Sequence, residues 1–327
     1  MIPALSKPVP VEQQIRVGVS TCLLGQSVRY DGGHKHDHYI TDTLARYFQL
    51  VPVCPEVESG MPVPREAMRL VGDPSNPRLM TIRSGQDLTA LMQSFCDRKL
   101  TELAQGDLCG FIFKKNSPSS GLYRVKVYSE KGGMPAQAGR GLFAAAFTGR
   151  FPLLPVEEEG RLCDAILREN FLERVFCYHR WQQLVAGDLS LGGLVEFHAR
   201  HKFLILSHSP SLLRELGRLV AMGKQFPLQE LHAQYLATLM KALSLHATPA
   251  KQVNTLQHIM GFFKQQLDSW EKQELLELFE QFRQRLVPLI VPITLLNHYI
   301  RKYQHDYLLQ QFYLTPHPHD LMLRNHV

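Results

Sequence analysis

Two cysteines and a glutamate stand where apolar stretches end, which is where strands deliver side chains to a site. Cys22 closes the run RVGVSTC, and Cys54 closes the run LVPVC. Glu56 follows Cys54 by two positions and belongs to the same neighbourhood. Thiolates from separate loops can share one metal centre, and a carboxylate beside them could act as a general base. The pattern indicates metal-assisted chemistry with a proton transfer.

A third segment that could take part in chemistry is the small-residue loop SPSSG at residues 117–121. It follows the apolar stretch CGFIFKK. Loops of this kind hold an anion, a metal cluster or a substrate edge. Arg29 and Arg65 could fix an anionic group with their planar guanidinium forks. Glycine and proline crowd the segments around these arginines, which suits a tight, rigid backbone.

Each of these residues also has an ordinary explanation when it is taken alone. A single cysteine at a strand end is more often a small buried residue than a ligand. Glu56 alone fits a solvated or helix-capping carboxylate. The alternating histidines of HKHDH, residues 34–38, resemble a metal site, but exposed loop residues near a substrate are the better interpretation. The functional hypothesis therefore depends on the segments meeting in space.

The elements between these segments predict that they do meet. Strand-like and helix-like stretches alternate in the order β-α-β-α-β, which is typical of an open parallel sheet of the α/β, Rossmann-like class. In such sheets ligands bind outside the carboxyl ends of the strands. We expect strands at 16–22, 50–54, 109–115 and 124–128, helices at 41–49 and 87–104, and converging loops at 20–37, 54–70 and 116–121.

The second half of the chain has a different pattern. Proline and acidic residues mark a junction at residues 152–164, and helical periodicity follows it. In the segment 269–286 one face carries Leu275, Leu278, Phe279, Phe282 and Leu286, and Asp268 with Glu271 resembles a capping box. We therefore expect a flexible tail at 1–14, an α/β domain at 15–155 and an all-α domain at 156–327.

Composition limits the classes of function. The chain has 327 residues, a formal charge of +6 and a pI near 9.0, which favours polyanionic partners only weakly. No apolar run is long enough to span a bilayer, and the first residues lack the apolar core of a secretory signal. Six cysteines in such a chain fit reduced thiols, so we expect a cytoplasmic protein with no membrane partner.

Taken together, the three loop segments resemble a known family. CLLGQSVRYDGG, VPVCPEVESGMPVPRE and KKNSPSSG are similar to the three signature segments of the thiouracil desulfurase family, over residues 15–155. The second half resembles the helical YbgA-like domain, through GRFPLLPVEEEGRL, ENFLERVFCYHRW, LVEFHARHKFLILSHSP, NTLQHIMGFF and PITLLNHYIRKY. The fusion of the two resembles the bacterial RNA desulfidases that convert 4-thiouridine in tRNA to uridine.

The resemblance implies a [4Fe-4S] cluster held by three cysteines, with the fourth iron free for the sulfur of a thiocarbonyl. Cys22 and Cys54 match the first and second ligands. The third family ligand lies in a Ser-Pro-Ser-Cys-Gly loop, and Ser120 stands at that position here. Serine is a hard oxygen ligand that binds such clusters poorly. Cys109 begins the strand that leads to the loop, about 20 Å from its far end.

The remaining cysteines offer the other substitutes for the missing ligand. Cys96 lies within a predicted helix, and Cys163 and Cys177 belong to the second half of the chain. Three outcomes stay open: a cluster with an unusual third ligand, a rearranged site, or a member that has lost its activity. A retained cluster is favoured because both matching cysteines and the glutamate are in place.

The resemblance also implies roles for the other site residues. Glu56 accepts a proton from the water that attacks C4 of the base, while Ser117 or Ser119 hydrogen-bonds the base edge or its sulfur. The substrate-binding residues are then Arg29, Asp31, Arg65 and Ser120. The open iron polarises the thiocarbonyl, the carbon–sulfur bond breaks, and no net electron transfer is required.

The partner implied by the fusion is tRNA, held by the helical domain. Basic residues gather there in the triplets Arg200–Lys202 and Arg301–Tyr303, which is the kind of surface that phosphate contacts need. One alternative is a desulfurase of free thiouracil, with the helical domain serving dimerisation or regulation. The other is a catalytically inactive RNA-binding or cluster-sensing protein. The sequence leaves the oligomeric state unknown.

Overall fold

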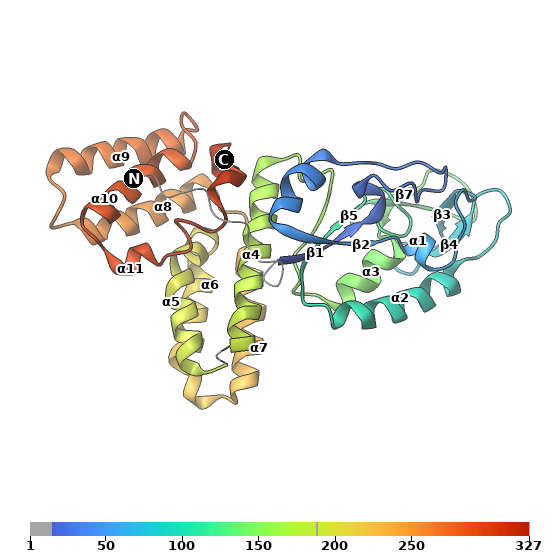
Figure 1. Cartoon of the computed structure of the whole chain (residues 1–327), viewed down its shortest axis with the longest axis horizontal. Helices are drawn as coiled ribbons and strands as arrows, with labels where there is room; N and C mark the ends of the chain where they lie inside the picture. The colour runs from blue at the N-terminus through green and yellow to red at the C-terminus, as the bar shows by residue number, and fades with distance from the viewer. Residues whose placement is uncertain (1–14, 188, 327) are drawn as a thin grey trace. The chain divides into compact units, whose positions relative to one another are not determined.

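The structure, a computed structural model, describes residues 15–187 and 189–326 and divides into two compact units (Figure 1). The first unit ends at Cys163 and the second begins at Asp164. The predicted flexible tail at residues 1–14 lies outside the described residues. Among the described residues, no helix combines the length and the hydropathy that crossing a membrane requires.

The first unit is built on a parallel sheet, as its alternating pattern predicts. Its strands lie in the order β2-β1-β5-β8, and all three pairings are parallel. Strand β5 is one of the two central strands, and it is buried at every position of its uncharged sequence LCGFIF. The strands are β1 (Ile15–Ser20), β2 (Phe48–Val53), β5 (Leu108–Phe113) and β8 (Val156–Glu158).

Two helices, α2 (Thr89–Ala104) and α3 (Leu142–Arg150), lie along one side of this sheet in Figure 1. Aromatic rings fix α3 on β5: the Phe147 ring lies 4.8 Å and the Phe143 ring 5.9 Å from the Phe111 ring, centroid to centroid. This packing places the amino end of α3 next to the loop that leaves β5.

A second sheet has the order β4-β3-β6-β7 and contains antiparallel pairs. The strand predicted at 124–128 is real, but it is β6 of this second sheet, where it pairs in parallel with β3. The sequence pattern gave no sign that the chain would leave the first sheet. The members are β3 (Met68–Val71), β4 (Arg78–Thr81), β6 (Val125–Tyr128) and β7 (Ala136–Gly139).

The helix predicted at 41–49 is wrong in type and extent. The chain forms one turn of π-helix at Tyr39–Thr43 and a 3-10 turn at Leu44–Arg46. Phe48 must already be extended because it pairs with Ile15 in the parallel sheet. Pairing in the sheet therefore overrides the helical spacing of the local sequence.

The acidic run at residues 157–159 is part of the first unit. Glu157 and Glu158 lie in β8, which pairs with β5, and the compact unit extends to Cys163. The sheet therefore includes residues beyond 155, where the sequence pattern placed the domain boundary. All three glutamates of the run are buried, which is unusual for carboxylates and requires partners.

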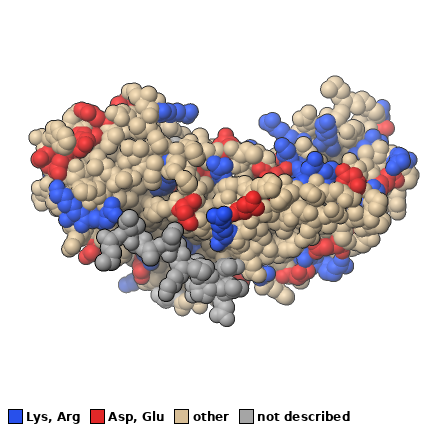
Figure 2. All heavy atoms as spheres, turned by 45° about the horizontal axis from the view of Figure 1, so that its top comes forward, with Lys and Arg blue, Asp and Glu red and all other residues tan. Residues whose placement is uncertain are grey.

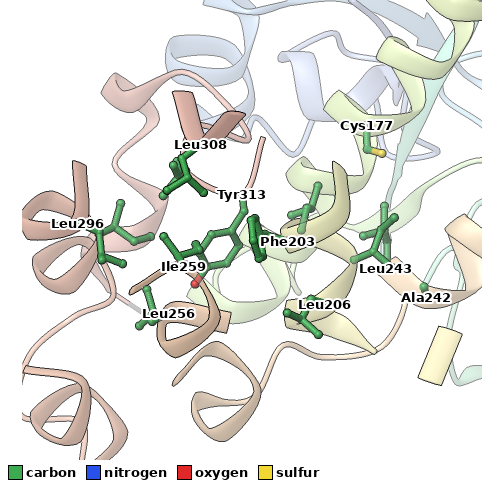
Figure 3. Packing of buried hydrophobic residues seen from close by; sticks show 14 of the residues in the cluster. Cys177, Phe203, Leu206, Ala242, Leu243, Leu256, Ile259, Leu296, Leu308 and Tyr313 are labelled. Atoms are coloured by element: carbon green, nitrogen blue, oxygen red, sulfur yellow. The ribbon is translucent and has the colours of Figure 1, made fainter. Parts of the chain in front are cut away.

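The second unit consists of helices joined by turns and contains no strand among its described residues. Its apolar core joins distant helices around Tyr313, Leu256, Ile259 and Leu296 (Figure 3). The helices are α4 (Ala165–Gly187), α5 (Leu191–His208), α6 (Pro210–Ala221), α7 (Leu228–Leu243), α8 (Pro249–Met260), α9 (Ser269–Arg283), α10 (Ile290–Lys302) and α11 (Asp306–Leu309).

Helix α9 tests the periodicity argument directly. Its capping box between Asp268 and Glu271 is present as predicted, and Leu275, Phe279 and Phe282 are buried. Leu286 is 69% exposed because the helix ends at Arg283, three residues before it. The predicted apolar face is thus correct within the helix and wrong beyond its end.

A buried ionic network anchors the carboxyl-terminal segment of the second unit to α4. The Arg324 guanidinium donates to Glu169 and to Glu173, with both distances 3.0 Å, and to the backbone oxygen of Tyr313. His208 Nε2 lies 3.2 Å from the other Glu173 oxygen. The His208 hydrogen bond and the Arg324 charge outweigh the effect of burial and lower the pKa of Glu173.

Replacing Arg324 by Met should destabilise the second unit by about 3–5 kcal/mol, because two buried carboxylates would lose their cation. Urea unfolding followed by tryptophan fluorescence reports this unit alone, since both tryptophans of the chain, Trp181 and Trp270, belong to it. Arg283→Met is the matched control because Arg283 is exposed, and it should cost little. Equal losses in both variants would contradict a special role for the network.

His317 makes the same unit sensitive to acid. Burial, with the Arg324 charge beside it, lowers the pKa of His317 to about 4. The stability that this neutral imidazole contributes is present above its unfolded pKa of about 6.5 and is lost as pH falls toward 4. Between pH 7.5 and pH 5 we expect the free energy of unfolding to fall by about 2 kcal/mol through this group. His317→Gln should remove that contribution from the dependence of the unfolding free energy on pH. An unchanged profile would refute the assignment.

Candidate functional site

The three predicted loops meet at one cavity of about 290 Å³ at the carboxyl ends of β1, β2 and β5. Parallel pairing of these strands puts their ends side by side, as the sequence argument requires. Of the residues predicted for the site, those that line this cavity are Cys22, Arg29, Cys54, Glu56, Ser117, Ser119 and Ser120. The structure therefore brings both cysteines, the glutamate and the serine loop together.

The two cysteines reach the cavity from adjacent strand ends. Cys22 lies in the 3-10 turn Thr21–Leu24 directly after β1, and Cys54 precedes the short helix α1 (Pro55–Glu58). Burial raises the pKa of Cys22 to about 11, while the Lys114 ammonium acts in the opposite direction. Burial also raises the pKa of Cys54. Both are protonated thiols at neutral pH until a metal displaces the proton.

Cys54 is held by the first turn of α1. Its own backbone N–H donates to Glu58 Oε1 at 2.7 Å, and Glu58 is in turn paired with Lys99 at 3.1 Å. The backbone N–H groups of Val57 and Glu56 act on the thiol and lower its pKa against the effect of burial. The amino end of this turn is thus arranged to favour negative charge on the sulfur.

Glu56 is oriented by two side chains from other segments. Its Oε1 accepts a hydrogen bond of 2.7 Å from the Ser119 hydroxyl, and its Oε2 forms an ion pair with Arg65. The Arg65 guanidinium also donates to the backbone oxygen of Val28 at 3.0 Å. Arg65 does not line the cavity, and it links Glu56 to the first loop, while its substrate contact stays a prediction.

The SPSSG loop is shaped by the amino end of α3. The backbone N–H of Leu142 donates to Pro118 O at 3.1 Å, and that of Phe143 donates to Ser119 O at 2.9 Å. This contact needs glycine at 141, where a Cβ would lie 2.5 Å from the Ser119 carbonyl atoms. Ser117 Oγ in turn accepts from the backbone N–H of Ser120 at 3.1 Å. The loop therefore presents its hydroxyl groups to the cavity from a fixed backbone.

The buried glutamates of the acidic run find their partners in this same region. Glu158 Oε1 accepts from the backbone N–H groups of Leu122 and Tyr123, at 2.8 and 3.1 Å. Glu159 accepts from the backbone N–H of Lys115 at 2.7 Å and pairs with the Lys114 ammonium. These carboxylates hold both ends of the serine loop. Sequence reasoning missed them, and the available signal was the position of three acids directly before a glycine.

The cavity carries a surplus of positive charge. Its Lys and Arg lining residues are Arg29, Lys35, Lys114 and Lys115, and Glu56 is its single acidic lining residue among those described. Lys114 is neutralised by Glu159, and Arg29 lies 3.4 Å from exposed Asp31. Lys35 and Lys115 form no ion pair within 4 Å among the described residues, although the Lys35 charge acts on the Asp31 carboxylate. Figure 2 shows Lys and Arg side chains gathered on one face of the first unit.

Other predicted candidates fall outside the cavity. Asp31 is exposed, and its carboxylate accepts from the backbone N–H of Gly33 at 3.1 Å, so it shapes the loop. His36, His38 and Asp42 are exposed, with ligand atoms within 4.8 Å of one another. The other cysteines do not line the cavity: Cys109 begins β5, Cys96 lies within α2, Cys163 is exposed, and Cys177 lies in the core of the second unit.

Comparison with known proteins separates the same two parts of the chain. The 2-thiouracil desulfurase family matches residues 17–159, and a family described as a protein of unknown function, DUF1722, matches residues 202–318. The uncharacterised protein YbgA of Escherichia coli (strain K12) is 32% identical over 158 residues, which are 48% of this chain and 94% of YbgA.

A solved structure is similar to the chain as well. It is described as the [4Fe-4S]-dependent thiouracil desulfidase TudS, is 32% identical, and has a TM-score of 0.37 over 46% of this chain and 95% of that one. The family segment at residues 17–159 contains Cys22, Cys54 and the serine loop. The chain therefore carries a domain of the 2-thiouracil desulfurase family at residues 17–159, followed by a YbgA-like domain, and through the latter it belongs to the family of YbgA.

Proposed function

We propose that this protein is a [4Fe-4S]-dependent desulfidase that removes sulfur from a thiolated uracil base, with 4-thiouridine in tRNA as its substrate. One observation carries the proposal: two cysteines, a glutamate and a serine loop from three separate segments line a single cavity in the part of the chain that matches the desulfurase family. The six cysteines of the chain are present as thiols and not as disulfides, which supports a reducing, cytoplasmic location.

The residues of the cavity fit a cluster with an altered third ligand. Thiolates are the ligands that iron–sulfur clusters select, and Cys22 and Cys54 line the same cavity. Ser120, at the third position of the family motif, is 4% exposed and also lines it. Cys22 and Cys54 would therefore hold the cluster through sulfur, with Ser120 beside it. When bound, such a cluster supplies a Lewis acid for the thiocarbonyl sulfur.

The chain itself supplies the proton transfer. Each carboxylate oxygen has two lone pairs, so Glu56 keeps acceptor capacity for a water while Ser119 and Arg65 fix its orientation. Glu56 takes a proton from the water whose oxygen bonds to C4 of the base. The carbon–sulfur bond then breaks as the carbonyl forms. Thiolated base and water give uracil and hydrogen sulfide, without net oxidation.

The charge of the cavity favours a phosphorylated substrate over a free base. Thiouracil is neutral and gains little from Lys35 and Lys115, whereas a polynucleotide brings phosphates next to the reacting base. A base within folded tRNA must also leave its stack before it can enter the cavity. The two lysines without an ion pair therefore support the proposal of an RNA substrate.

Replacing Lys35 and Lys115 together by Gln should lower kcat/KM for thiolated tRNA at least tenfold, because each lost phosphate contact weakens binding at moderate salt. Activity on free 4-thiouracil should change far less, since that substrate has no phosphate. The comparison is made in one buffer with both substrates. Equal losses on both would show that the lysines serve the cavity itself, and free thiobase would then be the better substrate.

In this proposal the second unit provides further contacts to the tRNA. His201, in the first of the two predicted basic triplets, is fully buried. Burial lowers its pKa well below the usual value, so the imidazole adds no charge. Lys302 is paired with Glu271 at 3.1 Å. Arg200, Lys202 and Arg301 remain as partly free cations of this surface.

The decisive experiment is anaerobic iron–sulfur reconstitution, followed by incubation with bulk tRNA that carries 4-thiouridine. About four irons per chain and loss of the thiocarbonyl absorbance are expected. Loss of absorbance with free 4-thiouracil but not with tRNA would select the free-base desulfurase. Absence of both the cluster and the turnover, with salt-sensitive tRNA binding retained, would select an inactive RNA-binding protein.

A further inference from the structure

The second unit contains a cavity of about 440 Å³ that the proposed chemistry does not use. It lies between α4 and α5 and includes Phe312 from the carboxyl-terminal segment. The residues that matter for its chemistry are Arg180, Glu196, Phe197, Arg200, His201 and Phe312. Two guanidinium groups and aromatic rings thus share one concave site.

Arg180 forms no ion pair within 4 Å with a carboxylate among the described residues, although the Glu173 charge and the Cys177 side chain act on it. Its Nε donates to His201 Nε2 and its Nη1 to the backbone oxygen of Pro316, both at 3.0 Å. Its Nη2 is buried and has no hydrogen-bond partner. Burial lowers the pKa of Arg180, and the Cys177 and Glu173 side chains offset part of that effect. Such a group costs stability unless an anion joins it.

His201 cannot provide that anion, and it contributes no charge of its own. Its Nδ1 lies 2.7 Å from the backbone oxygen of Phe197, so this nitrogen carries the proton. Its Nε2 accepts from Arg180. The imidazole is therefore neutral and serves to fix the Arg180 guanidinium.

Arg200 is the second cation, and it too is weakly compensated. Its carboxylate contact is with Glu196 at 3.6 Å, beyond hydrogen-bond distance, and the two side chains are 40% and 70% exposed. Its Nε is buried without a partner. Water screens this exposed pair, so it neutralises little of the charge.

The Phe312 ring holds the two arginines at the same site. The Arg180 Cζ lies 4.1 Å and the Arg200 Cζ 4.7 Å from the ring centroid. A backbone hydrogen bond of 3.0 Å from Phe312 to Arg200 O ties this segment to α5. Because both guanidinium groups contact the Phe312 ring, we expect this ring to position the two cations and not to stack on a nucleobase.

We propose that this cavity binds a phosphate group, held by the Arg180 and Arg200 guanidinium groups that both contact the Phe312 ring. Guanidinium forks match the oxygens of phosphate in a bidentate geometry, and the negative charge of a phosphate would offset the incompletely compensated guanidinium charges. The phosphate belongs either to the tRNA backbone, which rests on the proposed function, or to a free phosphorylated molecule. Both sources share the same recognition chemistry.

The first test uses the full chain and inorganic phosphate. Sodium phosphate should raise the Tm of the second unit, followed by tryptophan fluorescence, above its value in sodium chloride of equal ionic strength. Arg200→Gln should abolish this difference. Arg283→Gln, which removes an equal charge from exposed α9, should retain it. No difference in the wild-type protein, or equal loss in both variants, would overturn the proposal.

A second arm identifies the source of the phosphate. If it is the tRNA backbone, Arg200→Gln should weaken tRNA binding about tenfold and reduce the slope of log K against log salt by about 1, while Arg283→Gln changes neither. Loss of the phosphate effect with unchanged tRNA affinity would support a free phosphorylated ligand. Neither readout involves turnover, so failure of the desulfidase proposal would leave this result intact.

Discussion

Glu56→Gln should lower the rate of desulfidation by about 10²–10⁴-fold, the range that a positioned general base contributes. Gln keeps the size of the side chain and can still contact Ser119 and Arg65, so the cavity should keep its shape. It cannot accept a proton from water at neutral pH. The loss should therefore appear in kcat and not in KM.

The measurement is single-turnover loss of thiocarbonyl absorbance, with iron content determined on the same sample. Iron per chain should equal that of the wild type, because Glu56 is not required to hold the cluster. Glu102→Gln is the control, since Glu102 is an exposed carboxylate on α2 outside the cavity. A Glu56→Gln variant with wild-type turnover would remove the base from this mechanism.

Ser119→Ala separates positioning from proton transfer. This change removes the 2.7 Å hydrogen bond to Glu56 but leaves the carboxylate and its pair with Arg65. The base then keeps its chemistry and loses part of its orientation. The loss of desulfidation rate is therefore expected to be smaller than in Glu56→Gln. Equal losses in the two variants would contradict a positioning role for Ser119.

The sequence was sufficient to predict where the site lies. Alternating strands and helices imply a parallel sheet, and parallel strands bring their carboxyl ends together, so Cys22, Cys54 and the serine loop had to converge. The structure confirms the sheet and the meeting of the loops. The meeting of the loops could be predicted because it depends on the hydrophobic periodicity of each segment and on the order of strands and helices. Both can be read directly from the sequence.

What supports the site could not be predicted, because it depends on pairings between distant segments. Glu158 and Glu159 look like a solvated acidic junction in the sequence, yet their partners are backbone N–H groups more than 30 residues away. Arg65 resembled a substrate ligand and is instead buried against Glu56. A charged residue reveals its role only through the group that compensates it, and periodicity does not identify that group.

The same limit explains the errors in local structure. Residues 41–49 do have helical spacing, but Phe48 pairs with Ile15 of β1 and its backbone is therefore extended. Residues 124–128 have strand character, but the choice of a second sheet depends on β3, whose pattern is weak. Tertiary pairing decides between local options that differ by little free energy.

The second large effect concerns Ser120, which stands where the resemblance to the desulfurase family implies a cysteine. Restoring sulfur there by Ser120→Cys should slow the loss of iron to a chelator at least tenfold, because a thiolate is a far better ligand for iron in these clusters than a hydroxyl. The change replaces one small atom in a loop whose backbone α3 already fixes. Cys22→Ser should have the opposite effect and bring iron per chain close to background.

The two variants measure iron retention, so the result does not depend on turnover. Ser244→Cys adds a thiol to an exposed position of the second unit and should leave retention unchanged, which controls for adventitious iron on a new cysteine. If Ser120→Cys and Cys22→Ser both retain iron like the wild type, the cluster is not held in this cavity. If Cys22→Ser loses iron while Ser120→Cys gains nothing, the third ligand is already supplied by another group, and the hydroxyl at 120 faces the substrate instead.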